Sequence, residues 1–219
     1  MYFDAHCHLI DELSLNLAEK NGISALILNT TCPNEWKQVT ELFSEQVMIY
    51  PCAGIHPWFL DSLEADWEEK LDKFLKEHPN VMVGEVGLDY LKGNIEKQKE
   101  VFDKVLFLAQ KHNRCVHVHC VKAWHDMLYF VKKYNTLRFL FHNFSASESV
   151  IQTLLKYDVY FSISSDKNIN LLPENKVLVE TDSPSHDKKP EDVINLIEKM
   201  GLNSEKLWEN FQNFLKKVE

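Results

Sequence analysis

The chain has 219 residues, of which 45% are hydrophobic, and it carries a formal net charge of −9. Its arginines are Arg114 and Arg138, so a broad basic surface for duplex nucleic acid is not expected. No long apolar stretch suggests a membrane span, and the N-terminus runs into a strand-like segment without a basic leader. Reduced thiols in a cytoplasmic protein are predicted because no Cys-x-x-Cys pair is formed by the cysteines, which stand at positions 7, 32, 52, 115 and 120.

Short apolar runs alternate with amphipathic segments along the chain. Each run is nearly continuous in Val, Ile, Leu and Phe, as in buried parallel strands, which predicts strands at 2–8, 24–30, 48–55, 81–87, 114–120, 137–143, 158–164 and 177–182. The clearest helices between them are expected at 35–45, 64–77, 95–112, 123–134 and 147–156. The link 165–176 is too short and too interrupted by Asn and Pro for a full helix, and helices at 190–200 and 204–217 close the chain.

Eight strands with helical crossovers predict an α/β fold, a (β/α)8 TIM barrel slightly reduced from the roughly 250 residues typical of it, with C-terminal helices. A doubly wound open sheet is the alternative, but the glycine-rich turn that usually follows its first strand is missing. No internal repeat or linker is visible, so residues 1–219 are predicted to form a single domain.

Histidines and carboxylates lie near the downstream ends of several predicted strands, which in a barrel form one rim. Asp4, His6 and His8 share one side of the first strand because they are spaced two residues apart. The two imidazoles could grip one cation, with Asp4 orienting one of them from behind. Cys7 points to the other side and is expected to pack under a helix.

Further candidates follow on later strands. Glu85 lies in an apolar run, where a carboxylate is costly to bury unless it is paired or metal-bound. On the fifth strand His119 is nearer the rim and is the predicted ligand, whereas His117 is expected one layer deeper and hydrogen-bonded. His142 and Asp182 end the sixth and eighth strands. A lone histidine in a strand is commonly structural, but a set of such groups at strand ends predicts a shared metal site; structural roles are expected for the histidines at 78, 112, 125 and 186.

The combined motifs resemble the TatD family of metal-dependent hydrolases, within the amidohydrolase superfamily. They are Asp4-x-His6-x-His8, Gly54-Ile-His56-Pro57, Gly84-Glu85-x-Gly87-Leu88-Asp89-Tyr90, Gln98-x-x-x-Phe102, His119, His142-x-Phe144-Ser145 and Glu180-Thr181-Asp182-Ser183-Pro184. The resemblance implies a TIM barrel with a two-metal centre and deoxyribonuclease activity. It implies one metal ion held by His6, His8, Glu85 and Asp182, and a second shared by Glu85, His119 and His142. It also implies that His56 contacts the substrate phosphate or the attacking water.

The chain departs from the family pattern around these ligands. Val121 and then Lys122 stand where the family usually has an arginine two residues after the strand-five histidine, and Asn143 stands where a cysteine is usual. Lys122 would supply a point charge to a phosphate, and Asn143 is assigned with it to substrate binding. Trp58 and Trp124 follow strands three and five, so each either stacks on a base or packs between loop and helix.

These features predict metal-assisted hydrolysis with two divalent ions, Zn, Mn or Mg, and with Asp182 as general base. The expected substrate is a phosphodiester in single-stranded or frayed DNA ends. One alternative keeps the metals and cleaves a carboxyl ester or amide or a small phosphoester, including an aminoacyl ester on tRNA. Another is a weakly catalytic metal-binding subunit of a larger assembly. No membrane association and no obligate protein partner are expected.

Overall fold

The computed structural model describes residues 1–8 and 11–216. Its strands form one eight-stranded sheet in the sequential order β1 to β8, and neighbouring strands pair in parallel. This order confirms the (β/α)8 barrel and excludes the doubly wound sheet, whose strand order is not sequential. The strands are β1 (Tyr2–His8), β2 (Ile23–Asn29), β3 (Met48–Ile55), β4 (Met82–Asp89), β5 (Val116–Val121), β6 (Phe139–Phe141), β7 (Val159–Ile163) and β8 (Val177–Val179).

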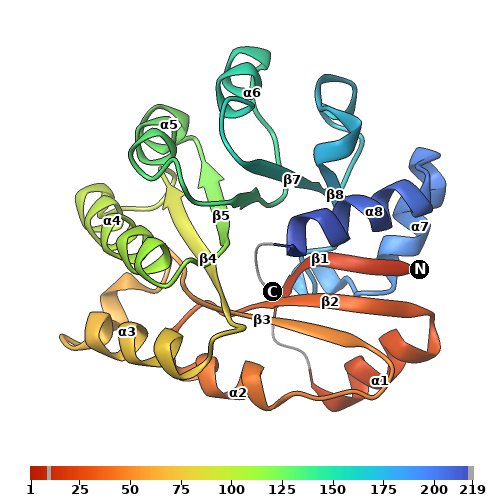
Figure 1. The fold of residues 1–219 in the computed structure, drawn as a ribbon, viewed down its shortest axis with the longest axis horizontal. Coiled ribbons are helices and arrows are strands. Elements are labelled where there is room, and N and C mark those ends of the chain that lie inside the picture. The colour runs from red at the N-terminus through yellow and green to blue at the C-terminus, as the bar shows by residue number, and fades with distance from the viewer. Residues whose placement is uncertain (9–10, 217–219) are drawn as a thin grey trace.

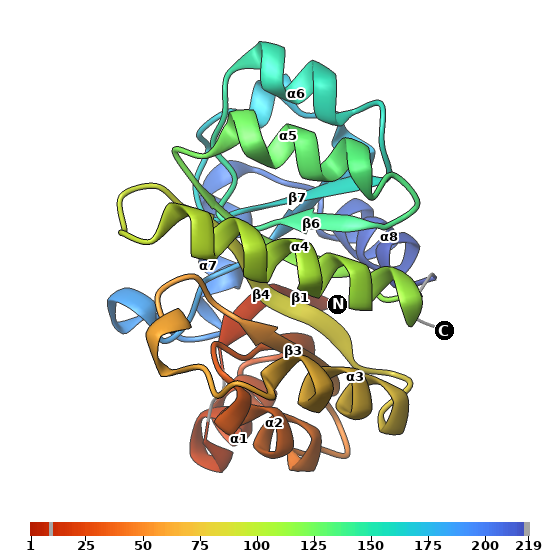
Figure 2. The same ribbon diagram turned by 90° about the vertical axis from the view of Figure 1, so that its left-hand side faces the viewer.

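Helices surround the strands, as Figure 1 shows, and Figure 2 shows α4 crossing between the α1–α3 group and the α5–α6 pair. A helix at 12–20 was not among those named from the sequence; the Asp11 side chain caps it by accepting the Ser14 N–H at 2.8 Å. The helices are α1 (Glu12–Lys20), α2 (Trp36–Glu41), α3 (Trp67–Glu77), α4 (Ile95–Lys111), α5 (Trp124–Lys133), α6 (Glu148–Leu154), α7 (Asp192–Met200) and α8 (Ser204–Leu215).

Several predicted boundaries extend too far. Helix α2 stops at residue 41 rather than 45, because Ser44 Oγ accepts the N–H groups of Gln46 and Val47 and forms a turn there. Strands β6 and β8 end at residues 141 and 179, and positive φ angles at Asn143 (41°) and Asp182 (59°) turn the chain away from extended geometry shortly afterwards.

The last residue of the predicted helix 204–217 lies outside the described residues. The 165–176 link has only short 3₁₀ turns, as predicted.

The barrel closes between its first and last strands through the segment that follows β8. The Asp182 N–H donates to the His6 carbonyl at 3.0 Å, and the His8 N–H donates to the Ser183 carbonyl at 2.7 Å. Helix α8 covers β1, where Phe211 stacks on Phe3 with ring centroids 4.3 Å apart. This closure brings the ends of the first and last strands, with their histidines and carboxylate, next to each other.

The interior is built from the strand side chains and the inward faces of the helices. None of the helices in the described part of the chain has the length and apolarity needed to cross a bilayer. Cys7, Cys32, Cys52 and Cys120 are free thiols, as expected, and Cys7 is fully buried with its Sγ 3.6 Å from the Ile27 carbonyl oxygen.

Candidate metal centre

The six predicted metal ligands meet at the rim formed by the carboxyl ends of the strands. His6 and His8 come from β1, Glu85 from β4 and His119 from β5. His142 and Asp182 follow β6 and β8 directly or after a short extension. Residues separated by most of the chain therefore lie in one cluster because the barrel gathers the strand ends.

The Glu85 carboxylate is at the middle of this cluster and is 2% exposed. Its Oε1 lies 2.7 Å from His142 Nε2, 2.8 Å from His119 Nδ1 and 3.3 Å from His56 Nε2. Its Oε2 lies 3.5 Å from His6 Nε2 and 3.4 Å from His8 Nε2. Asp182 Oδ1 is 3.2 Å from His8 Nε2 on the other side of that ring nitrogen. One buried carboxylate thus faces five imidazoles.

Glycines on β4 make room for this arrangement. A Cβ on Gly84 would lie 2.5 Å from the His117 Cβ, and a Cβ on Gly87, which has φ +153°, would lie 1.9 Å from the His119 carbonyl oxygen. The absence of side chains at these glycines therefore lets β5 lie close to β4 on both sides of Glu85.

Several ring nitrogens of the cluster are buried without a hydrogen-bond partner among the described residues: His6 Nδ1 and Nε2, His8 Nδ1, His119 Nε2 and His142 Nδ1. Three groups have ligand atoms within 4.8 Å of one another, namely His6–His142–Asp182, His6–His8–Glu85 and His56–Glu85–His119. Imidazole and carboxylate donors at this spacing are the ligands that divalent transition metals take in proteins. The residues present therefore fit metal binding.

The charges of the cluster shift the pKa values of its members. Burial acts to raise the pKa of Glu85, but His142, His56 and His119 hold it well below its usual value. Burial acts to lower the pKa of His142, but the carboxylates of Glu85 and Glu180 raise it well above its usual value. Ionised carboxylates and protonated imidazoles thus stabilise each other in the cluster. A metal ion that binds there would displace protons from the imidazoles.

The carboxylate of Asp4 does not orient a ligand ring, which corrects the sequence prediction. It accepts the His6 N–H at 3.2 Å and the Thr181 N–H at 3.0 Å, and it also accepts the Thr181 hydroxyl. Burial raises its pKa to about 8. Asp4 therefore joins β1 to the chain after β8 instead of supporting an imidazole, because its short side chain is taken up by the adjacent backbone.

Two other carboxylates stand behind the ligands and were not assigned from the sequence. Glu180 is fully buried, lies 3.5 Å from His142 Nδ1 and accepts the Asn143 N–H at 2.8 Å. Asp89 Oδ2 lies 3.5 Å from His119 Nε2. Glu180 lies two residues before Asp182, and Asp89 lies four residues after Glu85. An even spacing along an extended chain places side chains on the same side, and this is the sequence signal that would have found both carboxylates.

His56 lies in the cluster but its ring is oriented as a donor. Its Nδ1 accepts the Trp58 backbone N–H at 3.2 Å. A neutral imidazole that accepts at one nitrogen carries its proton on the other, so Nε2–H faces the Glu85 carboxylate 3.3 Å away. This favours contact with an anionic oxygen over metal ligation for His56.

The remaining predicted groups have varied surroundings. Lys122 is exposed after β5, and Asn143 is exposed with its amide oxygen accepting the Ser164 hydroxyl at 2.8 Å. Trp124 packs on Phe141 and Phe144, whereas Trp58 is 53% exposed beside the cluster. The prediction of packing thus holds for Trp124, and the base-stacking alternative is open only to Trp58.

His117 lies below His119, as predicted, but it is not hydrogen-bonded to any described residue. Both its ring nitrogens are buried without a partner, since the ring contacts the rings of Phe214 and His6. His112 contacts Asp72 at 2.7 Å, as a structural role predicts, whereas the side chain of His125 is fully exposed. His78 packs on Phe74, and the side chain of His186 lies outside what the structure describes.

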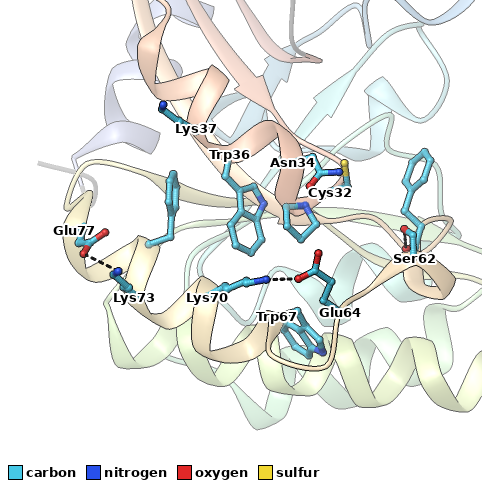
Figure 3. Close-up of a pocket in the computed structure, with 13 residues that line it drawn as sticks. Cys32, Asn34, Trp36, Lys37, Ser62, Glu64, Trp67, Lys70, Lys73 and Glu77 are labelled. Atoms are coloured by element: carbon cyan, nitrogen blue, oxygen red, sulfur yellow. Dashed lines mark hydrogen bonds and ion pairs between the residues drawn. The ribbon is translucent and has the colours of Figure 1, made fainter.

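The cluster opens into a cavity of about 250 Å³, lined by His8, Thr31, His56, Trp58, Phe59, Glu85, His119, His142, Asp182 and Ser185. A second cavity, of about 470 Å³, lies between α2 and α3 (Figure 3). Four of its charged side chains form pairs within the cavity, Lys70 with Glu64 and Lys73 with Glu77. None of the predicted site residues lines it, so the chemistry belongs to the smaller cavity.

Comparison with known proteins agrees with this site. The family model described as TatD related DNase matches residues 3–211. The chain belongs to this family. It is 27% identical over 205 residues to the Escherichia coli protein named uncharacterized metal-dependent hydrolase YjjV, covering 84% of this chain and 79% of that one. The crystal structure of YjjV has a TM-score of 0.86 to this TatD-family chain at 22% identity, covering 99% and 97% of the two chains.

Human relatives carry nuclease names. The chain is 26% identical over 216 residues to human deoxyribonuclease TATDN3, covering 83% of this chain and 77% of that protein. It is also 26% identical over 216 residues to the human 3'-5' RNA nuclease TATDN2, of which it spans only 28%. This TatD-family chain is thus similar to metal-dependent hydrolases and to nucleases.

Proposed function

We propose that this TatD-family chain hydrolyses phosphodiester bonds in single-stranded or frayed DNA ends. The observation that carries the proposal is the ring of imidazoles around Glu85, open to a cavity beside the Asp182 carboxylate. A site of this kind suits hydrolysis of an ester bond, and the deoxyribonuclease name of a relative supports a phosphodiester.

The proposal includes two divalent ions, Zn, Mn or Mg. His6, His8, Glu85 and Asp182 would hold one, and Glu85, His119 and His142 would hold the other. Bound ions would polarise a phosphoryl oxygen and provide a nucleophilic water near neutral pH. Imidazole-rich ligation favours Zn or Mn over Mg.

Asp182 is the general base of the proposed reaction. Its side chain is 18% exposed, against 2% for Glu85, so it reaches the cavity where water enters. His8 and His6 lower its pKa although burial acts to raise it, which keeps the carboxylate ionised and able to accept the proton of the attacking water.

His56 and Trp58 bind the substrate in this proposal. The Nε2–H of His56 donates to a non-bridging phosphate oxygen. The exposed Trp58 ring lies next to His56, with centroids 5.1 Å apart, and stacks on the terminal base. Lys122 and Asn143 stay predicted contacts to more distant parts of the strand.

The test uses chain purified without chelators and then reconstituted separately with Zn, Mn and Mg. Single-stranded, duplex and frayed DNA, labelled at either end, are incubated with the protein, and the products are resolved on denaturing gels. We expect shortening of the single-stranded and frayed substrates, and loss of at least about 100-fold in rate for Asp182→Asn, because the base is removed. His125→Ala, which changes a fully exposed histidine, is the matched control and should keep the wild-type rate.

A second candidate function is supported by the cavity wall. Among the described residues lining it there is no lysine or arginine, which is unusual for a phosphate site and suits a neutral carboxyl ester or amide, including an aminoacyl ester on tRNA. A panel of bis-nitrophenyl phosphate, nitrophenyl acetate and aminoacyl-tRNA separates the two. Cleavage of carboxyl esters alone would overturn the nuclease proposal. Metal binding without any turnover would favour the role of a subunit.

A cytoplasmic location and a single domain over 1–219 are part of the proposal. The free thiols of Cys7, Cys32, Cys52 and Cys120 support the location, and the continuous eight-stranded sheet supports the single domain. Fractionation of cells that produce the full chain would test the location.

A further inference from the structure

Asp89 is a buried carboxylate for which the proposed reaction has no direct use. It is the last residue of β4, its side chain is 3% exposed, and its Oδ2 lies 3.5 Å from His119 Nε2. The other nitrogen of that ring, Nδ1, lies 2.8 Å from Glu85 Oε1 and 3.1 Å from His142 Nε2. The His119 ring therefore turns one nitrogen to the ligand cluster and the other to Asp89.

The Asp89 carboxylate is held from several directions. Its Oδ2 accepts the Trp58 indole N–H at 2.6 Å, and its Oδ1 accepts the Leu91 N–H at 2.9 Å. Gln98, buried on α4, accepts the Asp89 N–H at 2.8 Å and donates to the Asp89 carbonyl at 3.0 Å. These contacts fix the position of the carboxylate beside His119.

The Asp89 carboxylate is available to accept a hydrogen bond from His119 Nε2. The indole of Trp58 and the backbone of Leu91 can only donate to Asp89. A carboxylate also faces Nδ1, since Glu85 Oε1 lies 2.8 Å from it. With a cation beside Glu85, Nδ1 uses its lone pair for the cation, and the ring proton on Nε2 points at Asp89 Oδ2. Only that tautomer lets the neutral ring bind a cation through Nδ1.

We propose that Asp89 is a positioning residue: it holds His119 in the Nε2-protonated tautomer with Nδ1 directed at the second metal position, and Trp58 holds Asp89 in place. The inference rests on the proposed two-ion site. The Asp89 carboxylate would thus connect Trp58, the proposed base-stacking residue, to His119, the proposed metal ligand.

The first measurement uses zinc-loaded wild-type protein labelled with ¹⁵N-histidine. Long-range ¹H–¹⁵N spectra at pH 8 report the tautomer of each ring, and comparison with His119→Gln assigns the His119 signals. We expect the Nε2-protonated form for His119. The Nδ1-protonated form would overturn the inference, and this result needs no variant of Asp89 to fold.

The second measurement uses Asp89→Asn, with Asp103→Asn as control because Asp103 pairs with Lys133 and Tyr134 on the helical exterior. Hydrogen-bond donors face both carboxylate oxygens of Asp89. In either orientation, an asparagine at position 89 would point its NH₂ group at one of these donors and lose that hydrogen bond. Calorimetric titration with Mn or Zn should show the second ion bound about 10- to 100-fold more weakly, the first ion unchanged, and the control like wild type.

Equal affinity of both ions in wild type and Asp89→Asn would overturn the inference while leaving the two-ion site intact. Binding of only one ion by the wild type would instead overturn the proposed two-ion site, on which the inference rests. Should Asp89→Asn fail to fold, Trp58→Phe is titrated in its place. It removes one contact to the carboxylate, so we expect a smaller fall in affinity for the second ion, and no fall would count against the proposal.

Discussion

At the scale of single residues, Glu85 organises the site. Its two oxygens face imidazoles from β1, from the residue after β3, from β5 and from the residue after β6. An isolated carboxylate would be strongly disfavoured at this depth, but here positive rings or cations neutralise it. The same surroundings explain why its pKa falls even though burial acts in the opposite direction.

His117 shows that a buried polar residue in this barrel need not be part of the chemistry. We expect His117→Leu to leave the free energy of unfolding unchanged or to raise it by up to about 1 kcal/mol, because two buried nitrogens without partners are replaced by apolar atoms of similar volume. Urea unfolding and metal content measure the effect, with His125→Leu as surface control. A loss of stability greater than about 2 kcal/mol would contradict the structure's description of this ring.

At the scale of elements, the close pairing of β4 with β5 determines where Glu85 and His119 meet. We expect Gly87→Ala to lower the free energy of unfolding by about 2 kcal/mol or more, because its φ is +153° and the new Cβ would overlap the His119 carbonyl. Gly93→Ala is the control, since a Cβ there meets open space. Similar urea midpoints for the two variants would contradict this prediction, because they would mean that β4 and β5 accommodate the new Cβ without a loss of stability.

Helices α3 and α4 are joined by Asp72, whose carboxylate contacts Lys111 at 2.7 Å and His112 at 2.7 Å. Lys111, and then His112, lower the pKa of Asp72 in the folded chain. Because the folded pKa lies below the unfolded one, the contribution to stability is present above about pH 4 and is lost as the pH falls through the folded value.

Asp72→Asn should therefore destabilise the chain at pH 7 by less than about 1 kcal/mol, since the pair is partly exposed. The difference from wild type should shrink below about pH 4. Urea unfolding at pH 7 and at pH 3.5 measures it. A difference that stays constant with pH would mean that packing, not charge, accounts for the effect.

At the scale of the whole molecule, the ligand cluster connects both halves of the barrel across its closure. An ion held by groups from β1, β4 and the chain after β8 binds only the closed fold. We expect chelation to lower the free energy of unfolding by roughly 2.7 kcal/mol relative to free metal at 100 times its dissociation constant. Thermal unfolding with and without EDTA measures this.

Glu85→Gln is the matched control for that measurement, because it removes the shared carboxylate and should abolish the response to metal. Identical unfolding midpoints with and without chelator for the wild type would show that the cluster does not hold an ion in the folded chain.

The local sequence determined the order of strands and helices and identified the predicted ligands that meet at the rim. Apolar runs of strand length specify buried parallel strands. Polar groups at the ends of these runs are costly to bury unless they pair with one another or bind a metal ion. Hence Glu85, His119 and Asp182 were found without coordinates, and the structure brings them together.

Only the tertiary structure decided which carboxylates contact the imidazoles of the predicted metal ligands. Asp4 turned to the backbone near Thr181, while Asp89 and Glu180 came to face ligand rings from neighbouring strands. Such contacts depend on the register between strands and on side-chain direction, and distances of a few ångströms are set by packing across the barrel. Sequence spacing specifies which side of a strand a residue occupies, but not which neighbour reaches it first.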